Sequence, residues 1–186
     1  MAENNAKNSN IEYTAVRRKV KYPRLEFKTG KLLLVLPENQ RSHVEVIEKH
    51  RKWIHEKNKF IQMALKHSKK KKLVGRPEGE FKKLAKSIVK GYADEGDFPI
   101  EHLFFRKMNS KWGSCSNKKN LTLNTLMKYL PQDIIKYIIY HELVHLREKR
   151  HNSSFWKAIS SEFPDYERKE KELFAYWFKI QKTVMK

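Results

Sequence analysis

Cysteine is almost absent from this chain, because Cys115 is the only one among 186 residues. A single cysteine cannot form an internal disulfide, which is typical of proteins in a reducing compartment. No apolar run approaches the roughly 18 residues that a membrane span needs, and residues 1–10 lack the apolar segment of a secretory signal. We therefore expect a cytoplasmic protein without integral membrane association.

Acidic residues are scarce relative to basic ones. The chain has 41 Lys and Arg against 21 Asp and Glu, which gives a formal net charge of +20. This excess favours polyanionic partners such as nucleotides or nucleic acid, although a solvated basic surface has the same composition. The same alternatives apply to a run of four lysines, which is either a solvated helix end or a patch that binds the phosphates of nucleic acid. The run comprises Lys69, Lys70, Lys71 and Lys72.

Hydrophobic residues make up 39% of the chain, which suffices for a sizeable core. We expect a disordered tail over residues 1–10 and a single domain over 11–186. Within that domain, residues 11–95 would supply strands and two basic amphipathic helices. Residues 96–186 would form the catalytic core.

Hydrophobic periodicity places the individual elements. Residues 24–28 and 32–36 read as two strands joined by a turn at 29–30. Ser42 and Glu45 have the spacing of a capping box, and they start a helix that runs into the four lysines. The later elements are a helix over 81–92, strands at 103–107 and 121–123, and helices over 131–147, from about 152, and from about 166 to near the end.

The segment from His141 to His145 reads His-Glu-Leu-Val-His and lies in a strongly helical context. Histidines four residues apart share one face of a helix, so two imidazoles can bind one zinc ion. Glu142 is rotated by about 100° from the first histidine, where its carboxylate can take a proton from water activated by zinc. The alternative is a hydrogen-bonded histidine pair without metal. It would leave the Glu142 carboxylate in a buried helix without a partner, which costs free energy.

Catalytic zinc takes three protein ligands and keeps a fourth position open. We predict His151 as the third ligand, although in one continuous helix it would lie about 15 Å along the axis from His141. The chain must therefore turn within 146–150, either through a left-handed Lys or Arg or through a wider turn, because no glycine is present there. Asn152 and Ser153 provide the cap of the next helix. The competing third ligands are glutamates on downstream helices: Glu162, Glu167 and Glu170.

Several separated motifs together resemble one family. They are Lys-Trp-Gly-Ser-Cys-Ser at 111–116, Asn-Leu-Thr-Leu-Asn at 120–124, the histidine motif with His151, and Phe155-Trp156. With these motifs the chain resembles the YgjP-like metal-dependent hydrolases, which are related to the zincin metallopeptidases and more distantly to SprT-like proteases.

The resemblance implies an α+β fold. This would be a small zincin-like metallohydrolase domain with an N-terminal strand and helix portion and a C-terminal active-site helix bundle. It also implies that zinc is held by His141, His145 and His151, with Glu142 as the general base.

The predicted function is that of a zinc-dependent metallopeptidase acting on a peptide or protein substrate. An extended peptide would pair with an edge strand, for which residues 121–123 are the candidate. One alternative is a nucleoside triphosphate (UTP) pyrophosphatase, an activity also attached to the family name. The lack of a glycine-rich phosphate loop or an acidic Mg²⁺ cluster counts against it. The other alternative is a nucleic-acid-associated protease or binding module, as the SprT likeness allows.

Three residues near the motifs are candidates for substrate binding: Trp112, Ser114 and Asn124. The alternative is that residues 112–115 are a packing and turn element between strands. Cys115 as a fourth zinc ligand would block the position that water needs.

Overall fold

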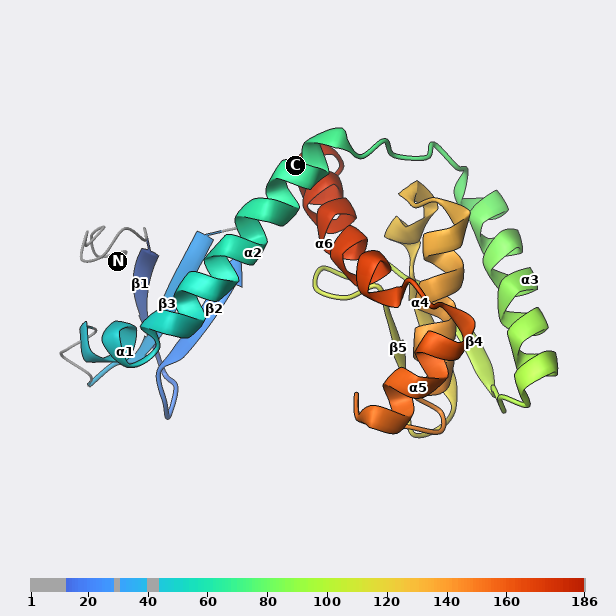
Figure 1. The fold of residues 1–186 in the computed structure, drawn as a ribbon, viewed down its shortest axis with the longest axis horizontal. Coiled ribbons are helices and arrows are strands. Elements are labelled where there is room, and N and C mark those ends of the chain that lie inside the picture. Colours follow the sequence, from blue (N-terminus) through green and yellow to red (C-terminus); the bar gives the residue numbers. More distant parts are fainter. Residues whose placement is uncertain (1–12, 29–30, 40–43, 186) are drawn as a thin grey trace. The chain divides into compact units, whose positions relative to one another are not determined.

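The computed structural model describes residues 13–28, 31–39 and 44–185, and the chain divides into two units between Lys69 and Lys70. The tail predicted at 1–10, the turn at 29–30 and the capping Ser42 lie outside the described residues. Both units contain helices and strands (Figure 1), which confirms the predicted α+β class. That residues 11–186 form one domain stays a prediction.

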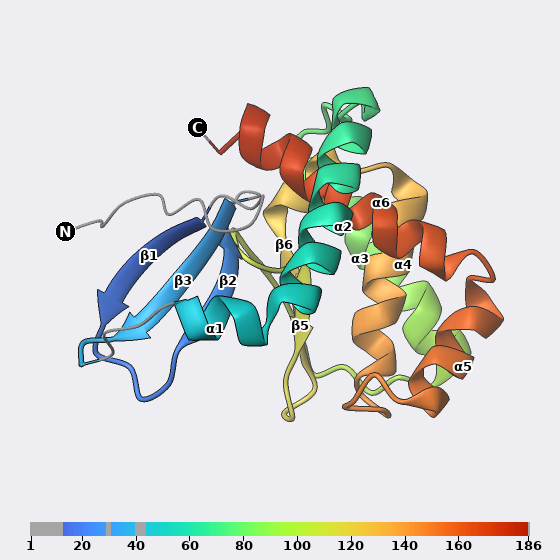
Figure 2. The same cartoon turned by 60° about the vertical axis from the view of Figure 1, so that its left-hand side comes forward.

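The first unit is a three-stranded sheet with two helices. Strand β3 lies in the centre, antiparallel to β2 and parallel to β1. Its apolar run is buried together with Ile47 and Ile54 of the helices, so one face of the sheet carries the core of this unit. Figure 2 shows the three strands side by side with α1 next to them. The elements are β1 (Tyr13–Arg18), β2 (Arg24–Lys28), β3 (Lys31–Pro37), α1 (Val44–Lys49) and α2 (Arg51–Lys70).

The long helix predicted in this unit is two helices, α1 and α2, with an interruption at His50. The His50 N–H is shared between the carbonyls of Val46, at 3.3 Å, and Ile47, at 3.2 Å. Regular bonding resumes where the Ile54 N–H donates to the His50 carbonyl at 2.9 Å. The interruption spans a single residue, and Ile47 and Ile54 still contribute to the same core.

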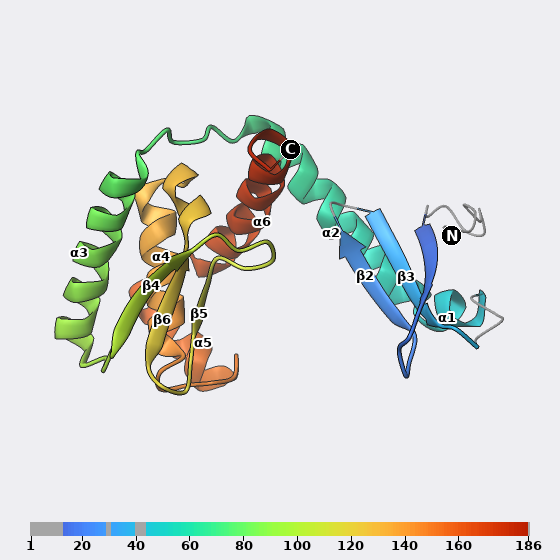
Figure 3. The same ribbon diagram turned by 180° about the vertical axis from the view of Figure 1, so that it is seen from behind.

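The second unit contains a three-stranded sheet with α4 on one side (Figure 3). Strand β6 is central, parallel to β4 and antiparallel to β5. Residues 121–123 therefore belong to a central strand, and the prediction that they form an edge is wrong. The elements are α3 (Glu78–Gly96), β4 (His102–Arg106), β5 (Gly113–Cys115), β6 (Asn120–Asn124), the 3₁₀ helix η1 (Thr125–Tyr129), α4 (Gln132–Val144), α5 (Ser153–Glu162) and α6 (Tyr166–Thr183).

Helix α4 lies at the centre of this unit because nearly all its apolar positions are buried. Ile134, Ile135 and Ile139 have no exposed surface, and they pack with Leu121 and Leu123 of β6. A helix that is apolar on most sides is expected in a core. The helix follows Pro131, as predicted, but it ends at Val144 and not near residue 147.

The four lysines at 69–72 do not form one uniform surface. Lys69 and Lys70 end α2 and are exposed, whereas Lys71 pairs with Glu172 of α6, Nζ to Oε2, at 3.1 Å. The Lys71 ammonium also lies 4.9 Å from the ring centroid of Tyr176. Lys71 is thus a structural contact of the second unit, and nucleic-acid binding by the other three lysines stays a prediction.

Within the described ranges, no helix has both the length and the apolar character needed to cross a membrane.

Candidate metal centre

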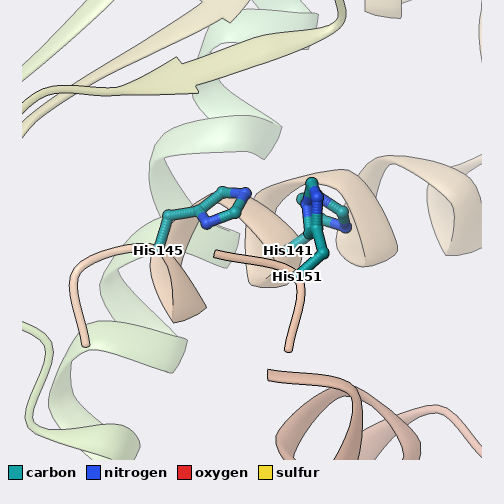
Figure 4. A group of neighbouring side chains, drawn as sticks. All are labelled: His141, His145 and His151. Carbon is teal, nitrogen blue, oxygen red and sulfur yellow. The ribbon is translucent and has the colours of Figure 1, made fainter. Parts of the chain in front are cut away.

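Three histidines gather at the end of α4. Among the described residues, the ligand atoms of His141, His145 and His151 all lie within 4.8 Å of one another (Figure 4), and we call this group the histidine cluster. His141 and His145 are one helical turn apart, with ring centroids at 5.1 Å. The Nε2 atoms of His141 and His151 are separated by 3.1 Å. The predicted set of three imidazoles is therefore brought together, and their ligation of a metal remains a proposal.

A wide turn returns the chain from α4 to His151. The N–H groups of Leu146 and Arg147 donate three residues back, to Leu143 and Val144, at 2.9 and 3.0 Å. No residue of this segment has a positive φ, so of the two predicted solutions the wider turn is the one formed. Asn152 then caps α5 as predicted, because its Oδ1 accepts from the Phe155 N–H at 2.9 Å.

Backbone and aromatic contacts orient the rings. The Nδ1 of His145 lies 3.0 Å from the Glu148 carbonyl, and this contact favours a proton on Nδ1 that leaves the Nε2 lone pair for a metal. Phe155 stacks on His145 and Trp156 on His151, with ring centroids at 4.7 and 5.6 Å. Phe155 and Trp156 of α5 therefore form a wall that limits the rotation of two of the three imidazoles.

The surroundings of His141 and His151 favour the neutral form of imidazole, which is the form that binds metals. Burial, and then the neighbouring His145 and His151, lower the pKa of His141 to about 3. Burial also lowers the pKa of His151. Neutral imidazoles with converging nitrogens are a donor set suited to zinc and to several other transition metals.

Glu142 lies beside the histidine cluster and packs against strand β5. A Cβ placed on Gly113 would lie 2.7 Å from the Glu142 Cγ, so only glycine leaves room for this side chain. Burial raises the pKa of Glu142 to about 7, against the opposing effects of the Lys111 ammonium and a hydrogen bond from the Cys115 backbone N–H. The carboxylate is thus held in place by backbone and tuned toward neutral pH, where a general base works best.

We expect Gly113→Ala to lower hydrolysis by about 10²-fold, because the new methyl displaces the Glu142 carboxylate and such displacements are costly to catalysis. Metal content should not change, since the three atoms nearest the added Cβ all belong to Glu142 and none to the histidine cluster. Gly91→Ala in α3 is the matched control, because its added Cβ meets nothing within 4 Å. Equal loss of hydrolysis in both variants, measured with metal content, would contradict this role of Gly113.

The competing ligands lie outside the histidine cluster. Glu162 accepts a hydrogen bond from Tyr92 Oη at 3.1 Å, and Glu170 Oε1 lies 3.9 Å from Nδ1 of His141. Since His141 faces His151 through Nε2, Glu170 is on the side of the ring away from that contact. Cys115 is half-buried and also outside the cluster, and burial, followed by the charge of Glu142, raises the pKa of its thiol.

Two cavities adjoin at the centre, and both are bordered by His141, Glu142 and His151. The apolar cavity, of about 330 Å³, is lined by Trp112, Tyr137 and Ile138 and by four residues of α6, namely Glu170, Leu173, Phe174 and Trp177. The polar cavity, of about 590 Å³, is lined by Ser114, Cys115, Ser116 and Asn117 and by Lys119 and Lys149.

The three predicted substrate-binding residues have different surroundings. Trp112 borders the apolar cavity and Ser114 the polar one, so both lie next to the histidine cluster. Asn124 has no exposed surface, and its amide bonds the backbone of Met108, Lys111 and Leu126 at 2.8 to 3.2 Å. The structure therefore gives Asn124 a structural role in place of the predicted substrate contact.

Sequence reasoning missed several residues of the site. Its candidates do not include Gly113 or the α6 residues. Of the packing and turn element considered at 112–115, residues 113–115 form an edge strand. The spacing of Glu170, Leu173, Phe174 and Trp177 on one helix face was a usable signal. Their position beside the histidines depends on tertiary packing, which spacing does not reveal.

Comparison with known proteins agrees with this geometry. The YgjP-like, metallopeptidase domain model matches residues 66–176, which include the whole histidine cluster and Glu142. The chain belongs to the YgjP-like family. Membership makes it a metallohydrolase-family protein, and a metallopeptidase family implies a divalent metal.

Individual relatives are more distant. The UTP pyrophosphatase of Escherichia coli (strain K12) is 31% identical over 58 residues, which are 31% of this chain and 35% of that protein. The chain thus spans about a third of the length of the curated relative it matches.

Two solved structures are also similar, both of metallopeptidase zymogens. Abylysin of Pyrococcus abyssi is 24% identical and covers 55% of this chain and 96% of its own, with a TM-score of 0.44. Jannalysin of Methanocaldococcus jannaschii is 28% identical, and the match covers 54% of this chain and 97% of jannalysin, with a TM-score of 0.44.

Proposed function

We propose that this chain is a zinc-dependent metallopeptidase, with His141, His145 and His151 as the ligands and Glu142 as the general base. The convergence of three imidazoles next to one buried carboxylate carries this proposal. Zinc bound there would supply Lewis acidity, which polarises a carbonyl and lowers the pKa of water. The donor set fits a catalytic ion, because three protein ligands leave a fourth position open.

Glu142 is the group that moves protons in this proposal. Its carboxylate takes a proton from the attacking water and then delivers it to the amine that leaves the cleaved peptide bond. The Cys115 N–H donates to this carboxylate and fixes its direction during both transfers. Phe155 stacks on the ring of His145 and Trp156 on that of His151, and these contacts hold the two rings in place.

The geometry suggests β5, and not β6, as the strand that pairs with substrate. The Trp112 carbonyl and the Ser116 N–H bond to β6, at 2.8 and 3.0 Å. Because strand backbone groups alternate in direction, those of Gly113 and Cys115 point away from β6. The Cys115 N–H on this side donates to Glu142, so the Gly113 N–H and the two carbonyls are the groups that would pair with a peptide. An extended peptide added at this edge would pass directly beside Glu142, which is the arrangement expected of strand addition.

Turnover of two substrates by one zinc-loaded preparation tests the function. We expect a fluorogenic casein to be cleaved and UTP to be left intact, with Glu142→Gln as the inactive control. The name of the E. coli relative is the observation that favours the alternative, hydrolysis of UTP to UMP and pyrophosphate. Release of pyrophosphate without cleavage of casein would overturn the peptidase proposal in favour of that alternative.

A further inference from the structure

One face of helix α6 is apolar and borders the apolar cavity. Glu170, Leu173, Phe174 and Trp177 follow the i, i+3, i+4, i+7 spacing of a single helix face, and all four line the cavity. An apolar stripe of this kind normally packs into a core. Here the face is only partly covered, with Phe174 43% exposed. This helix therefore presents apolar side chains to an open space beside the proposed base.

The opposite wall gives this space the shape of a side-chain pocket. Trp112 meets Trp177 edge to face, with ring centroids at 4.8 Å and planes at 88°. Tyr137 and Ile138 of α4 are buried and complete the lining. A dry cavity of about 150 Å³ already holds a benzene ring, so about 330 Å³ admits the side chain of Leu, Met or Phe.

Charge and position indicate what kind of group enters. Apart from the metal centre and Glu142, the charged groups of the lining are the carboxylate of Glu170 and the single ammonium of Lys111, so the cavity has no group of basic side chains to hold a phosphate. Glu142, His141 and His151 also border this cavity. A side chain inside it thus belongs to a residue next to the bond under attack.

We propose that the apolar cavity is a specificity pocket that takes a large apolar side chain from the residue flanking the cleaved peptide bond. This inference rests on the peptidase function proposed above and names its substrate class: peptides with Leu, Met or Phe at that position. Removing one methylene from a ligand of an apolar pocket changes kcat/KM by about 10- to 200-fold. The loss from Leu to Gly is expected to be at least that large.

Cleavage of a random peptide mixture by the zinc-loaded chain, read by mass spectrometry, tests the preference. Large apolar residues should be enriched on one side of the cleaved bonds. Leu173→Trp fills the cavity and should move the preference to Gly and Ala. If Leu173→Trp does not fold, Phe174→Trp is used in its place. Lys171→Trp, on the exposed side of α6, is the matched control and should keep the parent preference. Cleavage without enrichment overturns the pocket and leaves the peptidase function standing.

A binding measurement separates the pocket from the function. Zinc-loaded Glu142→Gln is titrated with a peptide that carries 4-nitrophenylalanine, which quenches tryptophan emission, and matched Leu and Gly peptides then compete for the site. The Leu peptide should displace the probe at a concentration at least 10-fold lower than the Gly peptide requires, and Leu173→Trp should abolish this difference. If the difference holds while no peptide is hydrolysed by the parent, the pocket stands and the peptidase function fails. Equal competition overturns the pocket.

A separate observation concerns the outer nitrogen of His141. Its Nδ1 is buried without a hydrogen-bond partner among the described residues. The closest carboxylate is that of Glu170, whose Oε1 lies 3.9 Å away and accepts a hydrogen bond from Tyr137 Oη at 2.6 Å. A buried N–H without a partner is costly, and metal-binding histidines regularly donate their second N–H to a carboxylate.

We infer that Glu170 is a positioning residue for His141. Its carboxylate accepts the Nδ1–H of His141 once a metal is bound at Nε2, and this contact fixes the tautomer and ring direction of the ligand. Tyr137 Oη donates to the same oxygen, Oε1, and so holds it near His141. Glu170 therefore supports the metal centre from outside the histidine cluster, although it is not a ligand.

Metal affinity, measured by competition with a chelator, and the visible absorption of the Co²⁺ form test this role. Glu170→Ala should weaken Zn²⁺ binding by about 10- to 100-fold and alter the Co²⁺ spectrum. Glu170→Gln should recover most of the affinity, because an amide oxygen still accepts the N–H. Glu167→Ala, an exposed acid on the same helix, is the matched control and should bind as the parent does. Parent-like affinity and spectrum in Glu170→Ala overturn the inference.

Discussion

Glu142→Gln should retain its metal and lose hydrolysis by roughly 10²- to 10⁴-fold, the usual cost of removing a general base. The amide has the size of the carboxylate and can accept the Cys115 N–H through its oxygen, so the backbone contacts of the site are preserved. It cannot take a proton from water near neutral pH. Zinc content by atomic absorption and initial rates on one substrate measure the two effects separately.

The alternative explanation of such a loss is a displaced side chain, because Glu142 packs closely on Gly113. Glu142→Asp distinguishes the two explanations, since it keeps a carboxylate but withdraws it by one methylene. We expect Asp to retain more activity than Gln. If Gln is as active as the parent, Glu142 is not the base and the mechanism proposed above is wrong.

The second large effect is expected on metal content. His151→Ala should lower zinc from about one ion per chain to well below that, because two imidazoles fall short of the three protein ligands of a catalytic zinc site. His151 is exposed and the α5 cap belongs to Asn152, so the fold should survive the change. Equilibrium dialysis against a zinc buffer, with circular dichroism to check folding, measures this.

His102→Ala is the matched control, since this exposed histidine on β4 is not a member of the histidine cluster. Its zinc content should equal that of the parent. Unchanged zinc content in His151→Ala would transfer the third ligand to another group, with Glu170 the first to examine because it lies within 3.9 Å of His141.

Local spacing predicted the part of the site that a helix determines. His141 and His145 share a face because they are four residues apart, and Asn152 could be identified as a cap from its type and position. The distance between His141 and His151 in a continuous helix shows that the chain must turn before His151. It does not predict the form of the turn, which depends on hydrogen bonds back to the carbonyls of Leu143 and Val144.

Features that depend on strand order or on distant partners escaped prediction. Strand β6 is central because β4 pairs with its other side, and nothing within residues 120–124 indicates that neighbour. The Asn124 side chain donates to the carbonyl of Met108, 16 residues earlier in the chain. The Glu170 carboxylate lies 3.9 Å from Nδ1 of His141, 29 residues earlier. Such contacts are set by packing of the whole unit, which a periodic pattern does not encode.

Helix α6 joins two places that are otherwise separate. Glu172 and Tyr176 hold Lys71 where the second unit begins, while their neighbours Leu173 and Trp177 line the apolar cavity. The residues that contact Lys71 and those that line the cavity alternate along the same turns of one helix, so their positions are fixed by the same backbone. Within the second unit, the first residues after α2 and one wall of the apolar cavity therefore share a single rigid support.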